Sequence, residues 1–242
     1  MTLPAVASVV TTDGETLYYL AAVNFFLLTV WLWVNYNYHG KQSAAHAARR
    51  AALIVNGLGE ELSAGEKRRL SEKFTVGADK AQKAQKNDYY ASDKEPGPLK
   101  LLECLEESAF YSSKLHKLSA NAWFWIVTGY AVVFAVLVIF FIPSATNDYL
   151  MISVRIFFAV TVFVLSADVF GSLLAHRRCA EEASDVLSRI EIAKKDTVNP
   201  ADALLILEDY TSAIQGAPEI VPFVYKAREA NLNALWETYL KA

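Results

Sequence analysis

The chain has few cysteines and none of the common catalytic motifs. Its 242 residues include two cysteines, Cys104 and Cys179, whose spacing matches no metal-binding pattern. It has no Walker phosphate loop, no dinucleotide-binding glycine fingerprint, no HExxH zinc motif and no GxSxG nucleophile motif. The net charge of −3 gives no basic excess of the kind that binds nucleic acid. We therefore expect two free thiols, no cofactor, no nucleic-acid partner and no enzymatic activity.

Histidines are also scarce, and strand-like segments are missing. The four histidines lie in different predicted elements, so the sequence predicts no metal site; they are His39, His46, His116 and His176. Three acidic pairs, at 60–61, 106–107 and 181–182, fit either a divalent-ion ring in an oligomer or, more simply, solvent-exposed helix faces. No segment alternates apolar and polar residues over a useful length, which favours an all-α fold.

Apolar residues are abundant, and they are concentrated in three blocks. Hydrophobic residues make up 54% of the chain and the mean hydropathy is +0.22, against an apolar content of roughly 45–50% in soluble domains. The blocks are residues 17–36, 120–142 and 149–175. Each is long enough, at about 1.5 Å per residue, to cross a hydrocarbon core about 30 Å thick. Aromatic residues collect at the block ends, as is typical of transmembrane helices.

The distribution of basic residues predicts the orientation. Lysine and arginine are absent from residues 1–16 and from the connection 143–148, but the opposite flanks of the blocks carry Lys41, Arg49, Arg50, Lys114, Lys117, Arg177 and Arg178. The positive-inside rule then places the N-terminus outside and residues 37–119 and 176–242 in the cytoplasm. The first block has no basic segment before it and no small-residue cleavage site after it, so we expect an uncleaved anchor. The predicted fold is an all-α membrane protein with three transmembrane helices and a helical cytoplasmic bundle.

Capping signals mark the helices of the first cytoplasmic region. An alanine-rich helix over 43–57 is expected to stop at its glycines, and Ser63 with Glu66 forms a capping box for a helix that reaches residue 74. Residues 77–90 read as a short polar helix. A helix over 99–118, with apolar residues at helical spacing, is expected to continue into the second transmembrane helix; these residues are Leu102, Leu105, Ala109 and Leu115.

The sequence of the second cytoplasmic region predicts three more helical segments. The third transmembrane helix continues inward to about residue 195. Asn199 followed by Pro200 caps a helix that runs to about Gln215 and stops at Gly216. A last helix is expected from Pro218 to about residue 241, with an apolar stripe made of Phe223, Ala227, Leu232, Leu235 and Tyr239.

Two charged residues fall inside the third transmembrane block, Arg155 and Asp168. A charge in hydrocarbon is costly, by about 2.5–3.5 kcal/mol on insertion scales, and is a functional-site hypothesis by default. By depth, Arg155 matches Asn24 of the first block in an outer polar layer. In an inner layer, Asp168 matches two residues of the second block that can hydrogen-bond to it, Thr128 and Tyr130.

The two charges do not face each other. Thirteen residues separate them, which leaves them about 140° apart around a regular helix and roughly 20 Å apart along it. Ser166 shares the face of Arg155, and Thr161 shares the face of Asp168. Arg155 either snorkels to the outer surface or belongs to a polar layer. Asp168 either lines a polar pathway or subunit contact, or makes a structural hydrogen bond. Because three helices cannot enclose a hydrated path, a pore requires an oligomer.

Two stretches carry a family resemblance. They are DYYASDKEPGPLKLLECLEESAFYSSKL, residues 88–115, and ILEDYTSAIQGAPEIVPFVYKAREANLNALW, residues 206–236. With the transmembrane layout they resemble the SLATT or S-4TM bacterial membrane effectors, small helical proteins encoded beside nucleotide-signal synthases or nucleotide sensors in anti-phage systems. The resemblance implies a homo-oligomer that forms a pore in the bacterial inner membrane and depolarises it when triggered. The alternative is a non-conducting scaffold or sensor subunit that recruits a soluble partner through its cytoplasmic bundle.

The resemblance also implies a trigger, either a nucleotide second messenger or a soluble sensor protein. Basic cytoplasmic residues are the candidates for binding an anionic nucleotide; they are Arg49, Arg50, Lys67, Arg68, Arg69, Arg177 and Arg178. The alternative for each of them is a solvated surface charge. For the cluster at 176–178, anchoring to lipid headgroups is a further alternative.

Overall fold

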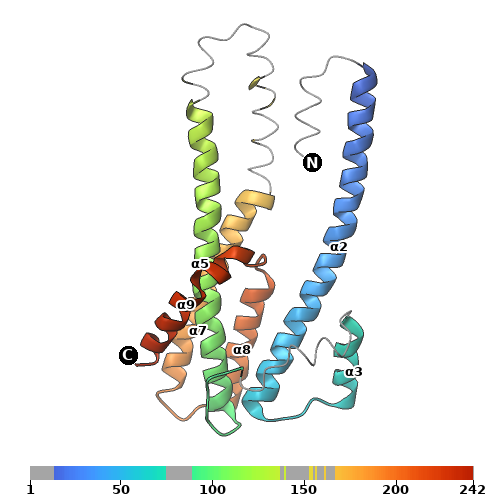
Figure 1. Cartoon of the computed structure of the whole chain (residues 1–242). Helices are drawn as coiled ribbons and strands as arrows, with labels where there is room; N and C mark the ends of the chain where they lie inside the picture. Colours follow the sequence, from blue (N-terminus) through green and yellow to red (C-terminus); the bar gives the residue numbers. More distant parts are fainter. Residues whose placement is uncertain are drawn as a thin grey trace. The chain divides into compact units, whose positions relative to one another are not determined.

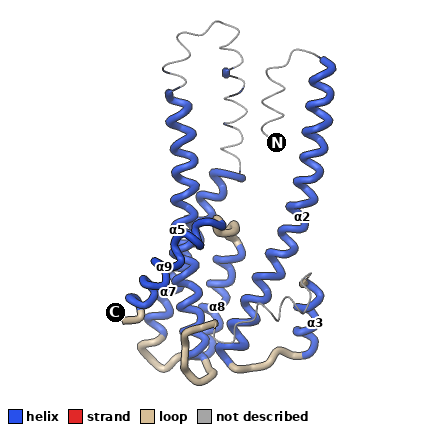
Figure 2. The backbone as a smooth tube through the Cα atoms, in the orientation of Figure 1, coloured by secondary structure: helices blue, strands red, loops and turns tan. Residues whose placement is uncertain are grey.

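The computed structural model describes residues 14–74, 89–136, 139, 153–154, 156, 161 and 167–241. Within these residues the backbone forms helices and connecting loops without any strand, which confirms the all-α prediction (Figures 1 and 2). Two helices, α2 and α5, are long and apolar enough to cross a membrane. Most of the third predicted transmembrane segment, 149–175, lies outside the described residues.

Helix α2 (Gly14–Leu58) is a single element of 45 residues. It joins the first predicted transmembrane segment to the alanine-rich segment after it. The helix ends where the sequence predicts, because Gly59 adopts a φ of 71°, a left-handed conformation that suits glycine. Gly57 lies two residues earlier, against the backbone of Leu101, where a side chain would have no room.

Helix α3 (Ala64–Lys73) begins at the predicted capping box. The Ser63 hydroxyl accepts a hydrogen bond from the Glu66 N–H at 3.3 Å, which confirms the prediction. Phe74, the predicted last residue, is the C-cap. The short polar helix predicted over 77–90 falls almost entirely on residues outside the description.

Helix α5 (Pro98–Val136) spans 39 residues without a break. It therefore carries the predicted helix over 99–118 straight into the second predicted transmembrane segment. The four apolar residues predicted at helical spacing are buried: Leu102, Leu105, Ala109 and Leu115. This part of the sequence prediction is confirmed.

A π-helical turn, η3 (Ala167–Gly171), precedes helix α7 (Ser172–Ala193). The sequence predicts regular helix here, so the prediction is wrong in local geometry although the continuation into α7 is confirmed. A π-helix adds a residue per turn, which rotates the side chains on either side of it relative to a regular helix. Asp168 is one of the five residues of this turn.

Helix α8 (Pro200–Gln215) has the predicted boundaries. The Asn199 side chain accepts from the Ala201 N–H at 2.9 Å, and Gly216 is the C-cap. Helix α9 (Pro222–Tyr239) begins four residues later than predicted. Proline suits the first turn of a helix and disfavours helical geometry in the residue before it. Val221 is non-helical, with a φ of −56° and a ψ of 119°, so Pro222 rather than Pro218 starts the helix.

The chain divides into two compact units. The first, here called the apolar unit, comprises Met1–Asn37 and Ala120–Leu174. The second, called the bundle unit, comprises Tyr38–Ser119 and Ala175–Ala242. Helices α2 and α5 contribute residues to both.

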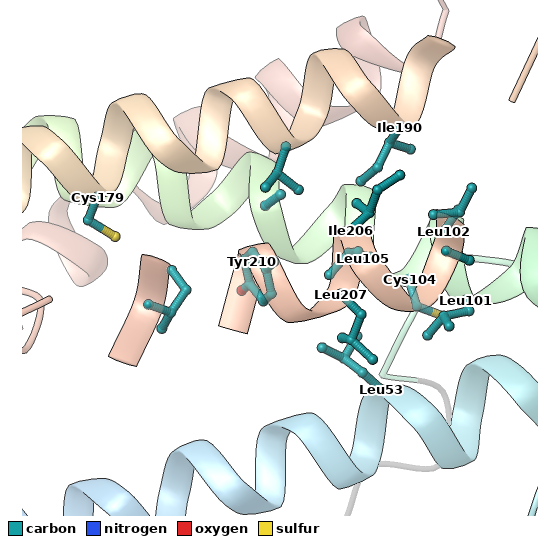
Figure 3. Close-up of a cluster of buried hydrophobic side chains, with 14 of the residues drawn as sticks. Leu53, Leu101, Leu102, Cys104, Leu105, Cys179, Ile190, Ile206, Leu207 and Tyr210 are labelled. Atoms are coloured by element: carbon teal, nitrogen blue, oxygen red, sulfur yellow. The ribbon is translucent and has the colours of Figure 1, made fainter. Parts of the chain in front are cut away.

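The described hydrophobic core belongs to the bundle unit. It gathers residues of α2, α5, α7 and α8. In Figure 3, Leu207 of α8 and Leu53 of α2 point toward one another, and Ile206 lies near Ile190 of α7. Helix α8 therefore buries side chains both against α2 and against α7. Burial of this kind contributes about 1.5–3 kcal/mol for each large apolar side chain.

Helix α9 packs on the bundle through its C-terminal half. Leu232 and Trp236 are buried, and the Trp236 ring lies 5.1 Å from the ring of Phe110 in α5. The Tyr239 hydroxyl donates to Glu106 at 3.1 Å. The predicted stripe is therefore wrong in its first members, since Phe223 is 72% exposed. Ala227 and Leu235 are exposed too, and the buried positions are 232 and 236 with partly buried 239.

Candidate functional site

In the apolar unit, two of the predicted polar-layer residues meet. The Tyr130 hydroxyl of α5 lies 2.8 Å from the Thr161 hydroxyl. The sequence places Thr161 on the same face as Asp168 of a regular helix, so this contact turns the Thr161 position toward α5. Hydroxyl pairs of this type stabilise membrane helix contacts by roughly 0.6 kcal/mol on average.

The remaining polar-layer candidates are less connected in the described structure. Asn24 has a buried side-chain oxygen without a hydrogen-bond partner among the described residues. Thr128 is partly buried on α5. Arg155 and Ser166 lie outside the described residues, as does the side chain of Asp168. The predicted contacts from Asn24 to Arg155 and from Asp168 to α5 therefore stay predictions.

In the bundle unit, six of the seven basic ligand candidates pair with carboxylates. The ion pairs are Arg50–Glu208 (3.9 Å), Lys67–Glu61 (2.7 Å), Arg68–Glu72 (3.0 Å), Arg69–Glu66 (2.8 Å), Arg177–Glu181 (3.4 Å) and Arg178–Glu182 (2.7 Å). Exposed pairs of this kind contribute little to stability, but they partly neutralise the cation.

Arg49 is the exception within the described part of the chain. No carboxylate lies within ion-pair distance of it there, and its guanidinium carbon stands 6.0 Å from the centre of the Tyr210 ring. It lines a cavity of about 330 Å³ in the bundle unit. We call this the Arg49 cavity; its lining residues are Tyr38, Lys41, Gln42, Ala45, His46 and Arg49 of α2, His116 of α5, Ile214 of α8, and Ala217, Pro218, Glu219 and Ile220 of the α8–α9 linker.

Hydrogen bonds hold the α8–α9 linker in place beside the cavity. The Gln42 side-chain amide donates to the Ala217 carbonyl at 3.2 Å. The Val221 N–H donates to the buried Ser119 hydroxyl at 3.4 Å. The linker is thereby tied to α2 on one side and to α5 on the other, and the cavity wall follows both helices.

The charges around the cavity are unequal. Lys41 and Arg49 supply two positive charges and Glu219 one negative charge. Burial, followed by the positive charge of Arg49, lowers the pKa of His46. Its Nε2 atom is buried without a hydrogen-bond partner in the described residues. Burial and the negative charge of Glu219 raise the pKa of Tyr38. At neutral pH the lining thus carries a net positive charge.

A buried histidine pair adjoins the cavity. The Nδ1 atoms of His116 and His176 lie 2.8 Å apart, so the two rings share one proton between these atoms. Burial is the main reason that the pKa of His116 falls to about 4, and the charges of His176 and Arg49 add to it. Burial also lowers the pKa of His176. Both rings are therefore neutral near pH 7.

Sequence reasoning missed this pair, since it assigned the histidines to separate elements. The signal that could have found the pair is position along the chain. His116 lies just before the second predicted transmembrane segment and His176 directly follows the third, so both lie at the predicted cytoplasmic ends of these segments. In the described residues no group of three histidine, cysteine or carboxylate side chains is arranged to hold a metal ion.

The two cysteines are free and buried, as predicted for the thiols. Burial raises the pKa of Cys104 to about 11 and that of Cys179 to about 12. Thiols with such pKa values stay protonated at neutral pH and are poor nucleophiles. They pack as small apolar side chains in the bundle core.

A scan against protein-family models found no match, and neither did searches of curated proteins and of solved structures. The resemblance to the SLATT or S-4TM effectors therefore stays a hypothesis based on the two quoted stretches.

Proposed function

We propose that this chain is a pore-forming membrane effector of bacterial defence that assembles from several copies in the inner membrane. In this proposal three transmembrane helices cross the membrane with the N-terminus outside. The bundle unit lies in the cytoplasm, where a trigger acts on it. The open pore depolarises the cell.

The observation that carries the proposal is the continuity of α2 and α5. Each helix runs from a long apolar segment into the bundle unit without a break. At about 1.5 Å per residue, helices of 45 and 39 residues greatly exceed a hydrocarbon core about 30 Å thick. A change of packing in the bundle unit can therefore reach the predicted membrane segments along these continuous helices, provided that the trigger binds one arrangement better than the other.

Polar groups in the apolar unit add support. The hydroxyls of Tyr130 and Thr161 pair there, and Asn24 presents a buried oxygen that lacks a partner among the described residues. Buried polar groups in a membrane are expensive unless they face a partner or water. A neighbouring copy or a hydrated path can supply what a single chain does not.

Membrane potential in cells that express the chain tests this proposal. The original chain should depolarise the cells. Asp168→Leu should abolish the depolarisation if the inner polar layer lines the path. Asp185→Leu is the matched control, because it removes an exposed aspartate from α7 outside the predicted membrane segments and should change nothing. The proposal fails if cells with verified amounts of the membrane-inserted original chain keep their potential when the trigger is present.

A second candidate function is a non-conducting scaffold. The observation that favours it is a set of exposed apolar side chains on the helices of the bundle unit; they include Ile192, Leu205, Phe223 and Leu235. A soluble partner that covered several of them at once would remove apolar surface from water, which favours association. If purified chain reconstituted in liposomes carries no current but these residues are protected from hydrogen exchange or labelling by a soluble partner, the scaffold is favoured.

A further inference from the structure

We propose that the Arg49 cavity binds a phosphate-bearing anion, with Arg49 as its main ligand and Lys41 as the second. The inference rests on the proposed function, since it names the ligand class and the site at which a trigger would act. Its test is a binding measurement that does not depend on conduction.

The first argument is the state of Arg49. Its six basic counterparts are already paired with carboxylates, whereas Arg49 has no carboxylate within ion-pair distance in the described residues. The Arg49 guanidinium lies over the ring of Tyr210. Guanidinium presents a planar fork of N–H donors that matches the oxygens of a phosphate. An arginine at the wall of a cavity, without a carboxylate partner among the described residues, is thus equipped to bind one.

The second argument is the rest of the lining. Lys41 adds a second cation, and the buried Nε2 of His46 lacks a partner among the described residues. Glu219 opposes an anion, but its side chain is exposed and leaves the lining with a net positive charge. Burial is the main cause of the lowered pKa of His46 and the charge of Arg49 adds to it, so the ring is neutral and can offer an N–H to the anion.

The third argument concerns size and access. A volume of about 330 Å³ lies at the small end of the range of ligand pockets. It suits a phosphate with a modest attached group. Tyr38 and Lys41 directly follow the first predicted transmembrane segment, so the phosphate of a lipid headgroup and that of a free ester can both reach the site. The shared chemistry is a phosphate ester.

The cavity also joins parts that would have to move together. Its wall comes from α2, α5, α8 and the α8–α9 linker, and the linker is held by Gln42 and Ser119. Both cations of the lining, Lys41 and Arg49, lie on α2, so binding favours whichever arrangement of the wall keeps the cavity open beside that helix.

Titration calorimetry of the full chain in neutral detergent, with inorganic pyrophosphate as the probe, tests the site. Arg49→Gln should weaken binding by about tenfold or more, because a charge-assisted hydrogen bond is lost. Arg50→Gln is the control, since Arg50 is the next residue, carries the same charge and pairs with Glu208 outside the cavity; it should change the affinity less than about twofold. Lys41→Gln, at an exposed position that does not support the core, should weaken binding by about threefold.

The Glu219→Gln variant tests whether the ligand of the cavity is an anion. Removing this carboxylate should tighten pyrophosphate binding by about two- to fivefold. Equal affinities of the original chain, Arg49→Gln and Lys41→Gln would overturn the proposal, as would an absence of pyrophosphate binding in neutral detergent. A weakening by Glu219→Gln would overturn it as well.

Nanodiscs distinguish the two sources of phosphate. Pyrophosphate binding is compared in nanodiscs of phosphatidylcholine alone and of phosphatidylcholine mixed with phosphatidylglycerol. Competition by phosphatidylglycerol that disappears in Arg49→Gln supports the site with a lipid as its natural occupant. Binding that is independent of phosphatidylglycerol supports the site with a free ester as its occupant. Intact binding in a chain that never conducts would refute the pore but leave the site standing, and the reverse result would refute the site alone.

Discussion

The two units use the same helix in opposite ways. In the apolar unit, Phe25 and Trp33 of α2 are 70% and 68% exposed, whereas Leu53 of the same helix is fully buried in the bundle unit. The bundle unit buries its large side chains on itself. The apolar unit leaves them outside, where only lipid or other protein can cover them. One continuous helix thus carries exposed apolar side chains in one unit and buried ones in the other.

Both units contain buried polar groups, some paired and some without a partner among the described residues. In the bundle unit, buried hydroxyls and charges have partners: Ser112 with Tyr210 at 3.0 Å, and Glu106 with Lys194 at 2.7 Å. In the apolar unit, Asn24 has a buried oxygen with no partner among the described residues. Two ring nitrogens of the bundle unit, His46 Nε2 and His176 Nε2, are also buried without a partner among the described residues. The two units therefore differ in the exposure of their apolar side chains and not in the pairing of their polar groups.

The largest effect should come from the bundle core. Leu105→Ala removes a fully buried side chain and should lower the free energy of unfolding by about 2–5 kcal/mol. Phe25→Ala, in the apolar unit, should change it much less, because an exposed side chain leaves no cavity. Urea unfolding of the full chain in detergent, followed by near-ultraviolet circular dichroism, measures both. Equal losses would break the comparison.

Substitutions at two glycines, one in each unit, extend this comparison. A Cβ at Gly57 would come within 2.6 Å of the Leu101 backbone, so Gly57→Ala should destabilise the bundle unit by about 1–3 kcal/mol. Gly129→Ala in the apolar unit meets nothing within 4 Å and should cause no loss. Hydrogen exchange at the amides of residues 98–105 reports the difference. If Gly57→Ala leaves that exchange unchanged, the close approach of α2 and α5 is wrong.

The histidine pair predicts a pH dependence. The pKa of His116 is lowered from 6.5 to about 4 in the folded chain. Its contribution to stability is therefore complete above pH 6.5 and is lost as the pH falls toward 4. Between about pH 7 and pH 5 the unfolding free energy should drop by about 2 kcal/mol from this residue.

The same unfolding measurement on two variants checks the assignment. His116→Gln should remove most of the drop, whereas His39→Gln, at an exposed position, should preserve it. An unchanged slope in His116→Gln would assign the pH dependence to other groups.

The smallest effect is expected in the apolar unit. Tyr130→Phe removes the hydroxyl that meets Thr161 and should cost about 0.6 kcal/mol, the average for such bonds in membranes. A double-mutant cycle with Thr161→Val, measured by unfolding in mixed micelles, isolates the pair. A coupling energy of zero would remove this contact from the account.

Local signals explain what could be predicted. Ser63, Asn199, Gly59 and Gly216 mark helix ends through their own backbone and side-chain chemistry, and the structure places the ends there. The predicted start of α9 was wrong because two prolines, at 218 and 222, give the same signal for the first turn of a helix. Tertiary contacts choose between them: the linker between the prolines is held by Gln42 and Ser119, far away in sequence.

The site depends more on long-range contacts. Nothing in residue type separates Arg49 from Arg50; the difference is that Glu208 of α8, far away in sequence, lies within ion-pair distance of Arg50. The His116–His176 contact joins residues 60 apart in sequence and could not be read from local pattern. The π-helical turn at Asp168 has no sequence signal that we can identify.

Current through a planar lipid bilayer containing the purified chain tests the central claim most directly. The account predicts discrete current steps from the original chain, absent in Asp168→Leu and retained in Asp185→Leu. A bilayer that demonstrably holds the assembled original chain, and that passes no current with pyrophosphate or a cell extract supplying the trigger on the bundle side, would contradict it.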